Sequence, residues 1–215
     1  MVLLLPGTKA NEILKQALKP GVRGIPFGLA EHAVAVVIIT VAQAGFCLTG
    51  SIGTGILMRK NKEDGLTWSH PSACGLTGLG WGPQFGASLK HLIVFINHET
   101  ALEALLSENG LEVGGQAELT LGPFGRSAGL DMNISPTNGN YGMTYTIAFS
   151  QGAFLGLSMQ GAVVGARQAI NMYFYGKETT TRDIVMNEKA VTFPPQWRSL
   201  MDEVYAKLIY LTTPH

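Results

Sequence analysis

The stretch Ala73–Gly86, ACGLTGLGWGPQFG, indicates the fold more strongly than any other part of the 215-residue chain. It has glycine at positions 75, 78, 80, 82 and 86, and its other residues are mostly apolar. Glycine at this density destabilises a helix interior, and so apolar a stretch does not suit a flexible linker. We therefore expect extended backbone that lies close to neighbouring backbone, with Trp81 and Phe85 filling the space beside the glycines.

The same glycines could belong to a nucleotide-binding loop. The dinucleotide-binding spacing GxGxxG fails, because Gly78 and Gly80 would require glycine where the chain has Pro83. The phosphate-binding pattern GxxxxGK followed by Ser or Thr occurs nowhere in the chain. A structural role is therefore favoured over phosphate binding.

Composition predicts one domain and argues against a general nucleic-acid binder. Of all residues, 46% are hydrophobic and 14% are charged, which is enough for one substantial core at this length. Fifteen Lys and Arg residues balance fifteen Asp and Glu residues, so the basic surface needed for nucleic acid is not expected. Cys47 and Cys74 have no paired spacing and predict small buried thiols in a reducing compartment.

The sequence predicts no catalytic site, no cofactor and no metal site. The nearest approach to a nucleophile elbow, Gly156–Gly161, has the wrong spacing for GxSxG. Alternating oxygen-bearing side chains from Asp131 to Thr137 resemble a calcium loop, but Pro136 stands where that loop needs glycine. The histidines show no HExxH motif. We expect a protein that is not an enzyme.

The apolar segments predict a cytosolic protein. The start MVLLLPG is shorter than the apolar run of about 7 residues or more in a secretory signal. The stretch Ala33–Leu48 falls short of the about 20 residues that span a bilayer. We interpret it as a buried helix, at about residues 29–40, that runs into a buried strand.

Residues 8–19, TKANEILKQALK, predict an amphipathic helix with a basic polar face. Its apolar stripe consists of Ala10, Ile13, Leu14, Ala17 and Leu18. Lys9, Lys15 and Lys19 lie off the stripe, and Arg23 follows soon after. Two interpretations stay open from these residues: the helix docks on the core by its stripe, or it lies on a membrane surface.

The rest of the chain alternates between strand patterns and a few helices. Expected strands cover 44–50, 53–60, 66–69, 88–97, 111–121, 126–135, 140–150 and 153–165. Turns are expected at 62–65 and 137–140, and helices at 99–107, 180–187 and 197–211. These elements predict an α+β single domain. Its core would be a glycine-rich antiparallel sheet or barrel-like structure, with the amphipathic helix ahead of it and helices flanking both ends.

Taken together, these motifs resemble the SYLF domain family, which occurs alone or beside SH3 or FYVE modules. The shared stretches are TVAQAGF (40–46), GTGILMRK (53–60), WSHPSACGLTGLGWGPQFGA (68–87), HLIVFIN (91–97), LEVGGQAELTLGPFGR (111–126), SQGAFLGLSMQGAVV (150–164) and NMYFYG (171–176). The motif residues to which we assign a structural role are Trp68, Gly78, Gly80, Trp81, Gly82, Phe85, Gly122, Gly125 and Arg126. The resemblance covers most of residues 26–190.

The resemblance implies a non-enzymatic module that binds phosphoinositides at membranes, in several members through an amphipathic helix ahead of the domain. Residues 1–23 would then be the membrane-binding segment, and residues 24–215 the SYLF-like domain with its C-terminal helix. The lipid-binding residues would be Lys9, Ile13, Leu14, Lys15, Leu18, Lys19 and Arg23. Such a protein would be cytoplasmic and would associate peripherally with endosomal or plasma membrane.

Two alternatives remain. Some fungal members of the family also bind and bundle actin filaments, and here Arg59, Lys60 and Lys62 would meet the acidic filament. A solvated hairpin tip is the plainer interpretation of those three cations. The weaker alternative is a small apolar ligand held inside the β core, suggested by how apolar the strands are. No oligomeric state is predicted.

Overall fold

The computed structural model describes residues 4–18, 31–107, 111–120, 125–127, 144–187 and 191–213; for 4–6, 81–85, 111–120, 125–127 and 144–161 it describes the backbone. The helices are α1 (Leu4–Ala17), α3 (Glu99–Leu106), α4 (Gln168–Tyr175), α5 (Thr181–Met186), α6 (Arg198–Thr212) and the short 3-10 helix η2 (Pro195–Trp197). The strands are β1 (Ala35–Arg59), β2 (Ser72–Ile96), β3 (Leu111–Thr120), β4 (Gly125–Ser127) and β5 (Thr144–Ala166). None of the helices described is long and apolar enough to cross a membrane.

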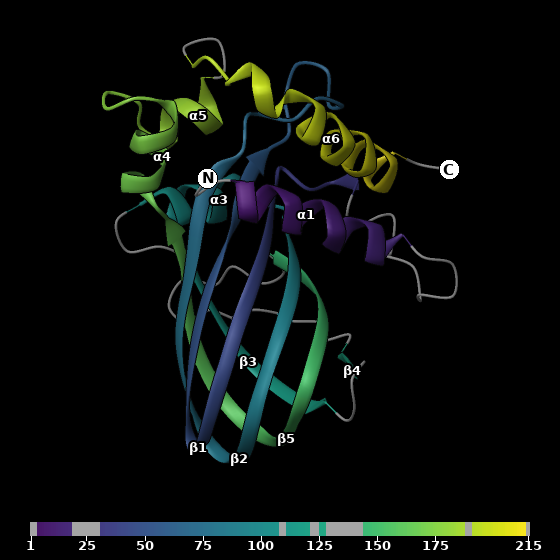
Figure 1. Ribbon diagram of the computed structural model, residues 1–215, viewed down its shortest axis with the longest axis vertical. Coiled ribbons are helices and arrows are strands. Elements are labelled where there is room, and N and C mark those ends of the chain that lie inside the picture. Colours follow the sequence, from purple (N-terminus) through teal and green to yellow (C-terminus); the bar gives the residue numbers. More distant parts are fainter. Residues whose placement is uncertain are drawn as a thin grey trace.

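One antiparallel sheet holds the molecule together (Figure 1). Its strand order is β1-β2-β5-β3, and β4 also pairs with β5. The predicted α+β class and antiparallel sheet are confirmed. In the described strands the path is open, with β1 and β3 as its ends, so the barrel-like form that the sequence suggested is not a closed sheet.

β1 folds back on itself between Gly45 and Leu48. Cys47, in the middle of this segment, has a φ of 59°, which is the left-handed region. At the other end of β1, the amide of Lys60 donates a hydrogen bond of 2.8 Å to the carbonyl of Val34. The first and second halves of β1 therefore lie against each other. β2 pairs with both halves, and Figure 1 shows β1, β2 and β5 bending together. We call this bend the folded end.

Glycine is required where the two halves of β1 meet. A Cβ at Gly45 would lie 2.1 Å from the carbonyl oxygen of Leu48, and one at Gly55 would lie 2.2 Å from that of Ile38. Real Cβ atoms do not approach other atoms so closely, so the backbone itself packs there. For the stretch Ala73–Gly86 the expected extended backbone is confirmed, and a Cβ at its Gly75 would lie 3.0 Å from Cδ of the Arg167 side chain. The stretch Ala73–Gly86 lies within β2, between β1 and β5.

Among the described residues, helices cover the end of the sheet opposite the folded end (Figure 1). On the outer face, α1 and α6 bury side chains such as Ile38 and Phe95. On the inner face, α3 packs against others, including Ile39 and Val94. Each such side chain contributes about 1.5–3 kcal/mol when fully buried. This half of the molecule is therefore the stable core, and it fixes where α1 sits.

Several element predictions need correction. The expected helix at 29–40 is wrong over most of its length, because β1 begins at Ala35. The pairs of strands expected at 44–50 with 53–60, and at 140–150 with 153–165, are single long strands, β1 and β5, in the residues described. Residues 66–69 form no strand and contribute only an isolated bridge between Lys60 and Trp68. Helix α4 was not predicted.

Other expectations are confirmed. The helices expected at 8–19, 99–107, 180–187 and 197–211 correspond to α1, α3, α5 and α6. Residues 62–65 form a turn in which Gly65 has a φ of 64°. The expected hairpin tip at 137–140 lies outside the described residues, as does most of the strand expected at 126–135.

Candidate functional site

Helix α1 is docked on the core by its apolar stripe. Ile13 is 2% exposed and Leu14 is 0% exposed. Both belong to the cluster that also contains Val204 and Leu208 of α6 and Phe95 of β2, and Leu18 packs partly against it. Of the two interpretations of this helix, core docking describes the structure. The side chains expected to enter lipid face the protein instead, and they would contact lipid only if α1 left the core.

The polar face of α1 remains accessible. The side chains of Lys9 and Lys15 are 52% and 58% exposed. Lys9 Nζ lies 2.8 Å from Glu12 Oε2, and its hydrogen bond and charge lower the pKa of the Glu12 carboxyl. Lys9 and Lys15 thus remain accessible on α1, Lys9 beside Glu12 and Lys15 near Glu203 of α6. Lys19 and Arg23 lie outside the described residues.

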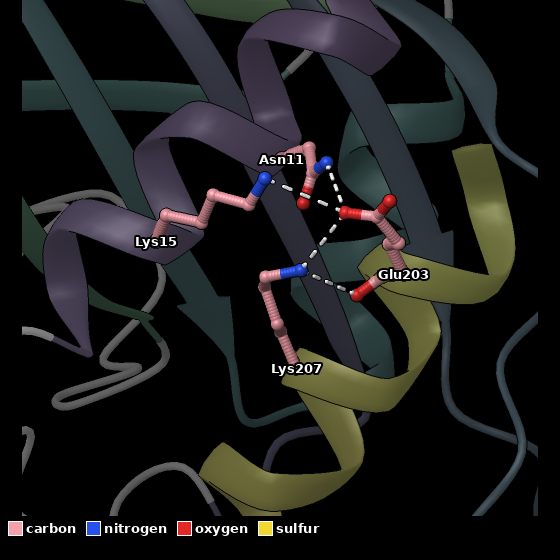
Figure 2. A network of polar contacts seen from close by, with 4 residues as sticks. All are labelled: Asn11, Lys15, Glu203 and Lys207. Atoms are coloured by element: carbon pink, nitrogen blue, oxygen red, sulfur yellow. Dashed lines mark hydrogen bonds and ion pairs between the residues drawn. The ribbon is translucent and has the colours of Figure 1, made fainter.

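A polar network joins α1 to α6 (Figure 2). Asn11 Nδ2 donates a hydrogen bond of 2.8 Å to Glu203 Oε2. Lys15 Nζ and Lys207 Nζ each lie 3.5 Å from the same oxygen. The Asn11 hydrogen bond and then the two lysine charges lower the pKa of Glu203. We call these four residues the Glu203 network.

The basic residues Arg59, Lys60 and Lys62 lie where β1 leads toward β2, at the opposite end of the sheet from the folded end (Figure 1). Arg59 Nη2 and Lys62 Nζ both lie 3.1 Å from Glu99 Oε1 of α3. These two cations therefore share one carboxylate. The cluster is more than a solvated hairpin tip, because Glu99 anchors it to α3.

Burial and the neighbouring positive charges shift the pKa of Glu99 in opposite directions. Burial acts to raise the pKa of Glu99, but the hydrogen bonds and charges of Lys62 and Arg59 outweigh burial and lower it. Burial lowers the pKa of Lys60, whose Nζ donates a hydrogen bond of 3.1 Å to the carbonyl of Glu31. A polar depression of about 240 Å³ lies beside Arg59 and Lys60 and reaches Met186 at the end of α5.

The motif residues occupy the sheet and its connections. Trp68 is 3% exposed and packs in the core cluster with α1 and α6. Gly78, Gly80, Trp81, Gly82 and Phe85 lie in β2, Gly125 and Arg126 lie in β4, and Gly122 lies outside the described residues. In the part of the chain that the structure describes, no three His, Cys, Asp or Glu side chains gather as a metal site would require.

Two features escaped the sequence analysis. Asn11 and Glu203 are 192 positions apart, so no local pattern signals their hydrogen bond. The folded end exposes Phe46, Ile52 and Leu79. A signal for that surface was present, because no charged residue occurs between Ala33 and Met58.

The family model and the similar proteins indicate the same family. Residues 77–207 match the Ysc84 family model, described as Las17-binding protein actin regulator. Protein YSC84 of Saccharomyces cerevisiae is 33% identical over 192 residues, which are 87% of this chain and 40% of that protein. LAS seventeen-binding protein 3 of the same species is 32% identical over 182 residues, covering 82% of this chain and 39% of the relative.

A vertebrate protein is as similar. SH3 domain-containing YSC84-like protein 1 of Bos taurus is 32% identical over 178 residues, which are 83% of this chain and 50% of that protein. The chain thus spans about half the length of these relatives or less. No solved structure matches. Both the family match and the long similarity to these relatives confirm the SYLF resemblance, and the chain belongs to the Ysc84 family of SYLF domains.

Proposed function

We propose that the chain is a non-enzymatic module that binds phosphoinositide-bearing membranes in the setting of membrane trafficking or cortical actin. The observation that carries this proposal is the surface of α1, where Lys9 and Lys15 stay exposed although the apolar stripe is docked. The family model is described as a Las17-binding protein actin regulator and one relative is named LAS seventeen-binding protein 3, which supports an actin-related setting. The module would be cytoplasmic and peripherally bound.

Charge alone gives weak binding. Lys9, Lys15, Lys19 and Arg23, at about 1 kcal/mol each near an anionic leaflet, give about 4 kcal/mol, which corresponds to about millimolar affinity. Useful binding therefore needs apolar contact or a specific headgroup contact as well. A phosphate group near α1 would compete with Glu203 for Lys15 and Lys207, because a multiply charged phosphate is a stronger partner than one carboxylate.

Flotation with vesicles tests this proposal. Removing residues 1–19 would also remove Ile13 and Leu14 from the core, so charge substitution is the sharper experiment. We expect Lys9→Gln with Lys15→Gln to weaken flotation with phosphoinositide vesicles about thirtyfold. Lys177→Gln, exposed in the turn after α4, is the matched control. Equal flotation of the double variant and the control would contradict the assignment to α1.

Actin binding is the second candidate. It is favoured by the names of the relatives and by the cluster of Arg59, Lys60 and Lys62, of which Lys62 is 65% exposed. We expect Lys60→Glu with Lys62→Glu to reduce co-sedimentation with actin filaments at physiological salt. If the unaltered chain fails to pellet with filaments at micromolar concentration, only the lipid proposal remains.

A small apolar ligand in the β core is the third and weakest candidate. The inner face near the helices is filled by apolar side chains that pack against α3. Nearer the folded end, the buried side chains include Gln43, Ser88 and Lys90, which would not suit an apolar molecule. Mass spectrometry of the native protein would reveal a co-purified lipid if one is held there.

A further inference from the structure

The outer surface of the folded end is apolar although it faces solvent. The exposed fractions are 71% for Phe46, 61% for Leu48, 65% for Ile52, 69% for Leu79 and 39% for Leu89. These residues come from both halves of β1 and from both halves of β2. A sheet face in contact with water normally carries polar side chains, and apolar patches of this kind mark interaction surfaces.

The buried surface of the same end is polar. Gln43 is 2% exposed, Thr49 0%, Ser88 7% and Lys90 4%. Strand alternation places Gln43 on the same face of β1 as Val41 and Ile39, which belong to the inner core. Along one face of β1, the inward side chains thus change from apolar near the helices to polar near the folded end. At this end, apolar side chains face solvent and polar side chains are buried, which is the reverse of the usual arrangement in a sheet.

All three long strands lack charge there. No charged residue occurs in β1 before Arg59, in β2 before Lys90, or anywhere in β5. A surface for a protein partner is usually surrounded by a polar rim with hydrogen bonds and charges. Strands with apolar outer side chains and polar inner ones are instead typical of strands surrounded by hydrocarbon.

We propose that the folded end inserts into the hydrocarbon of one membrane leaflet, with Phe46, Leu48, Ile52 and Leu79 in contact with acyl chains. This inference rests on the proposed membrane function and assigns its apolar contact to the sheet instead of to α1. Insertion of the folded end does not require α1 to leave the core. Ile13 and Leu14 remain in the core while the sheet supplies the insertion that charge alone cannot.

The dimensions and the charges fit this placement. From Thr40 to Phe46 the strand extends about 20 Å, and one leaflet of hydrocarbon is about 15 Å thick. Thr40 pairs with His91, and Thr40 Oγ1 lies 3.0 Å from His91 Nδ1. Lys9 of α1 lies near enough for its charge to act on His91, which also has its pKa lowered by burial. Lys9 would therefore sit beside the headgroups.

The chain contains its own labelling site for a test. Cys47 is exposed at the apex of the folded end, whereas Cys74 is buried. Burial raises the pKa of Cys74 to about 12, so its reactive thiolate is scarce at neutral pH. A polarity-sensitive fluorophore attached to the full chain will therefore report from Cys47. The vesicles are phosphatidylcholine alone and phosphatidylcholine containing phosphatidylinositol bisphosphate.

We expect the emission of the Cys47 label to shift to the blue on vesicle binding and to be quenched by lipids that carry a nitroxide on the acyl chain. We expect Ile52→Ser with Leu79→Ser to weaken vesicle partition about a hundredfold. Leu66→Ser, at an exposed leucine in the loop at the opposite end, is the matched control and should have no effect. A Cys47→Ser, Leu66→Cys chain carrying the same label should show no shift.

Other outcomes separate this inference from the proposed function. An unchanged Cys47 spectrum, while the protein still floats with phosphoinositide vesicles, would overturn insertion and leave headgroup binding intact. Insertion into both vesicle types alike would support insertion and remove the phosphoinositide preference. If Ile52→Ser with Leu79→Ser converts a dimer to a monomer and leaves partition unchanged, the surface joins two copies of the chain and insertion is wrong.

Discussion

Gly55 is a position in β1 where an added side chain should be strongly destabilising. A Cβ there would lie 2.2 Å from the carbonyl oxygen of Ile38 and 2.6 Å from the Cα of Ile39, so backbone atoms would have to move. We expect Gly55→Ala to lower the free energy of unfolding by about 3 kcal/mol, measured by urea denaturation.

Gly50 supplies the control for this substitution. A Cβ at Gly50 would meet nothing within 4 Å, although it belongs to the same half of β1. Gly50→Ala should leave stability unchanged or raise it slightly, because alanine restricts the unfolded chain. Equal losses in the two variants would show that the halves of β1 do not approach as closely as described.

At the scale of elements, Asn171 connects α4 to its neighbours. It is 0% exposed, its Nδ2 donates to Ser72 Oγ at 2.8 Å and to Thr181 Oγ1 at 2.9 Å, and its Oδ1 accepts from the Ala73 amide at 2.7 Å. Asn171→Leu removes the hydrogen bonds that Asn171 makes to the Ala73 amide and the Ser72 hydroxyl, while Thr181 Oγ1 keeps its bond to Gln168 Oε1. We expect a loss of about 3 kcal/mol in the free energy of unfolding.

A second substitution on the neighbouring helix calibrates that loss. Thr180 and Asp183 form the capping box of α5 at the surface. Thr180→Ala removes one cap and should cost about 1 kcal/mol. A smaller effect for Asn171→Leu than for Thr180→Ala, in the same urea experiment, would mean that α4 and α5 are not tied to β2 through Asn171.

The Glu203 network predicts a pH dependence for the docking of α1. The folded-state pKa of Glu203 lies below its ordinary value of 4.5. Its stabilising contribution is therefore complete above pH 4.5 and is lost as the pH falls through the lowered pKa. We expect Glu203→Gln to be less stable than the unaltered chain at pH 7, with the difference disappearing in strong acid. Urea denaturation over this pH range measures it.

Asp202 offers the matched control, because it is exposed on the same helix one position earlier. Asp202→Asn should not show the loss of stability at pH 7 that is expected for Glu203→Gln. If Glu203→Gln and Asp202→Asn behaved alike at every pH, then a general change of charge on α6 would explain the effect and the hydrogen bond from Asn11 would not.

The sequence predicted elements well where local signals were complete. The stripe of α1 lies within a single helix, so its periodicity was enough to locate that helix. The start of β1 was misassigned because Val36–Ile39 is buried on both faces, and a continuous apolar run has no alternation to distinguish a strand from a helix. α4 is anchored by Asn171, its one fully buried side chain, and a hydrophobic pattern does not reveal a buried polar residue.

The candidate site was less predictable, because it depends on contacts between distant segments. The stripe containing Ile13 and Leu14 could equally face lipid or core, and only the position of α6 decides between them. The reversed polarity near Gln43 could not be recognised while β1 was taken as two short strands. Which side chains point inward became clear only from the fold-back at Cys47.

At the scale of the whole molecule, the inferred insertion surface and the proposed actin surface lie at opposite ends of the sheet. The folded end lies at Cys47, whereas Lys60 and Lys62 lie beyond the other end of β1 (Figure 1). Contacts that share no residues and lie far apart contribute additively. One copy of the chain could therefore hold a membrane at one end while an acidic filament binds at the other.

This separation gives a bridging prediction. Vesicles carrying the bound chain should co-sediment with actin filaments at low centrifugal force, because the chain links the two. Lys60→Glu with Lys62→Glu should abolish bridging and leave vesicle flotation unchanged, since these lysines lie at the opposite end of the sheet from the folded end. Ile52→Ser with Leu79→Ser should abolish bridging and leave filament binding unchanged. A variant at either end that reduced both bindings in equal measure would instead indicate one shared surface, because independent ends cannot respond together to a local change that leaves the chain folded.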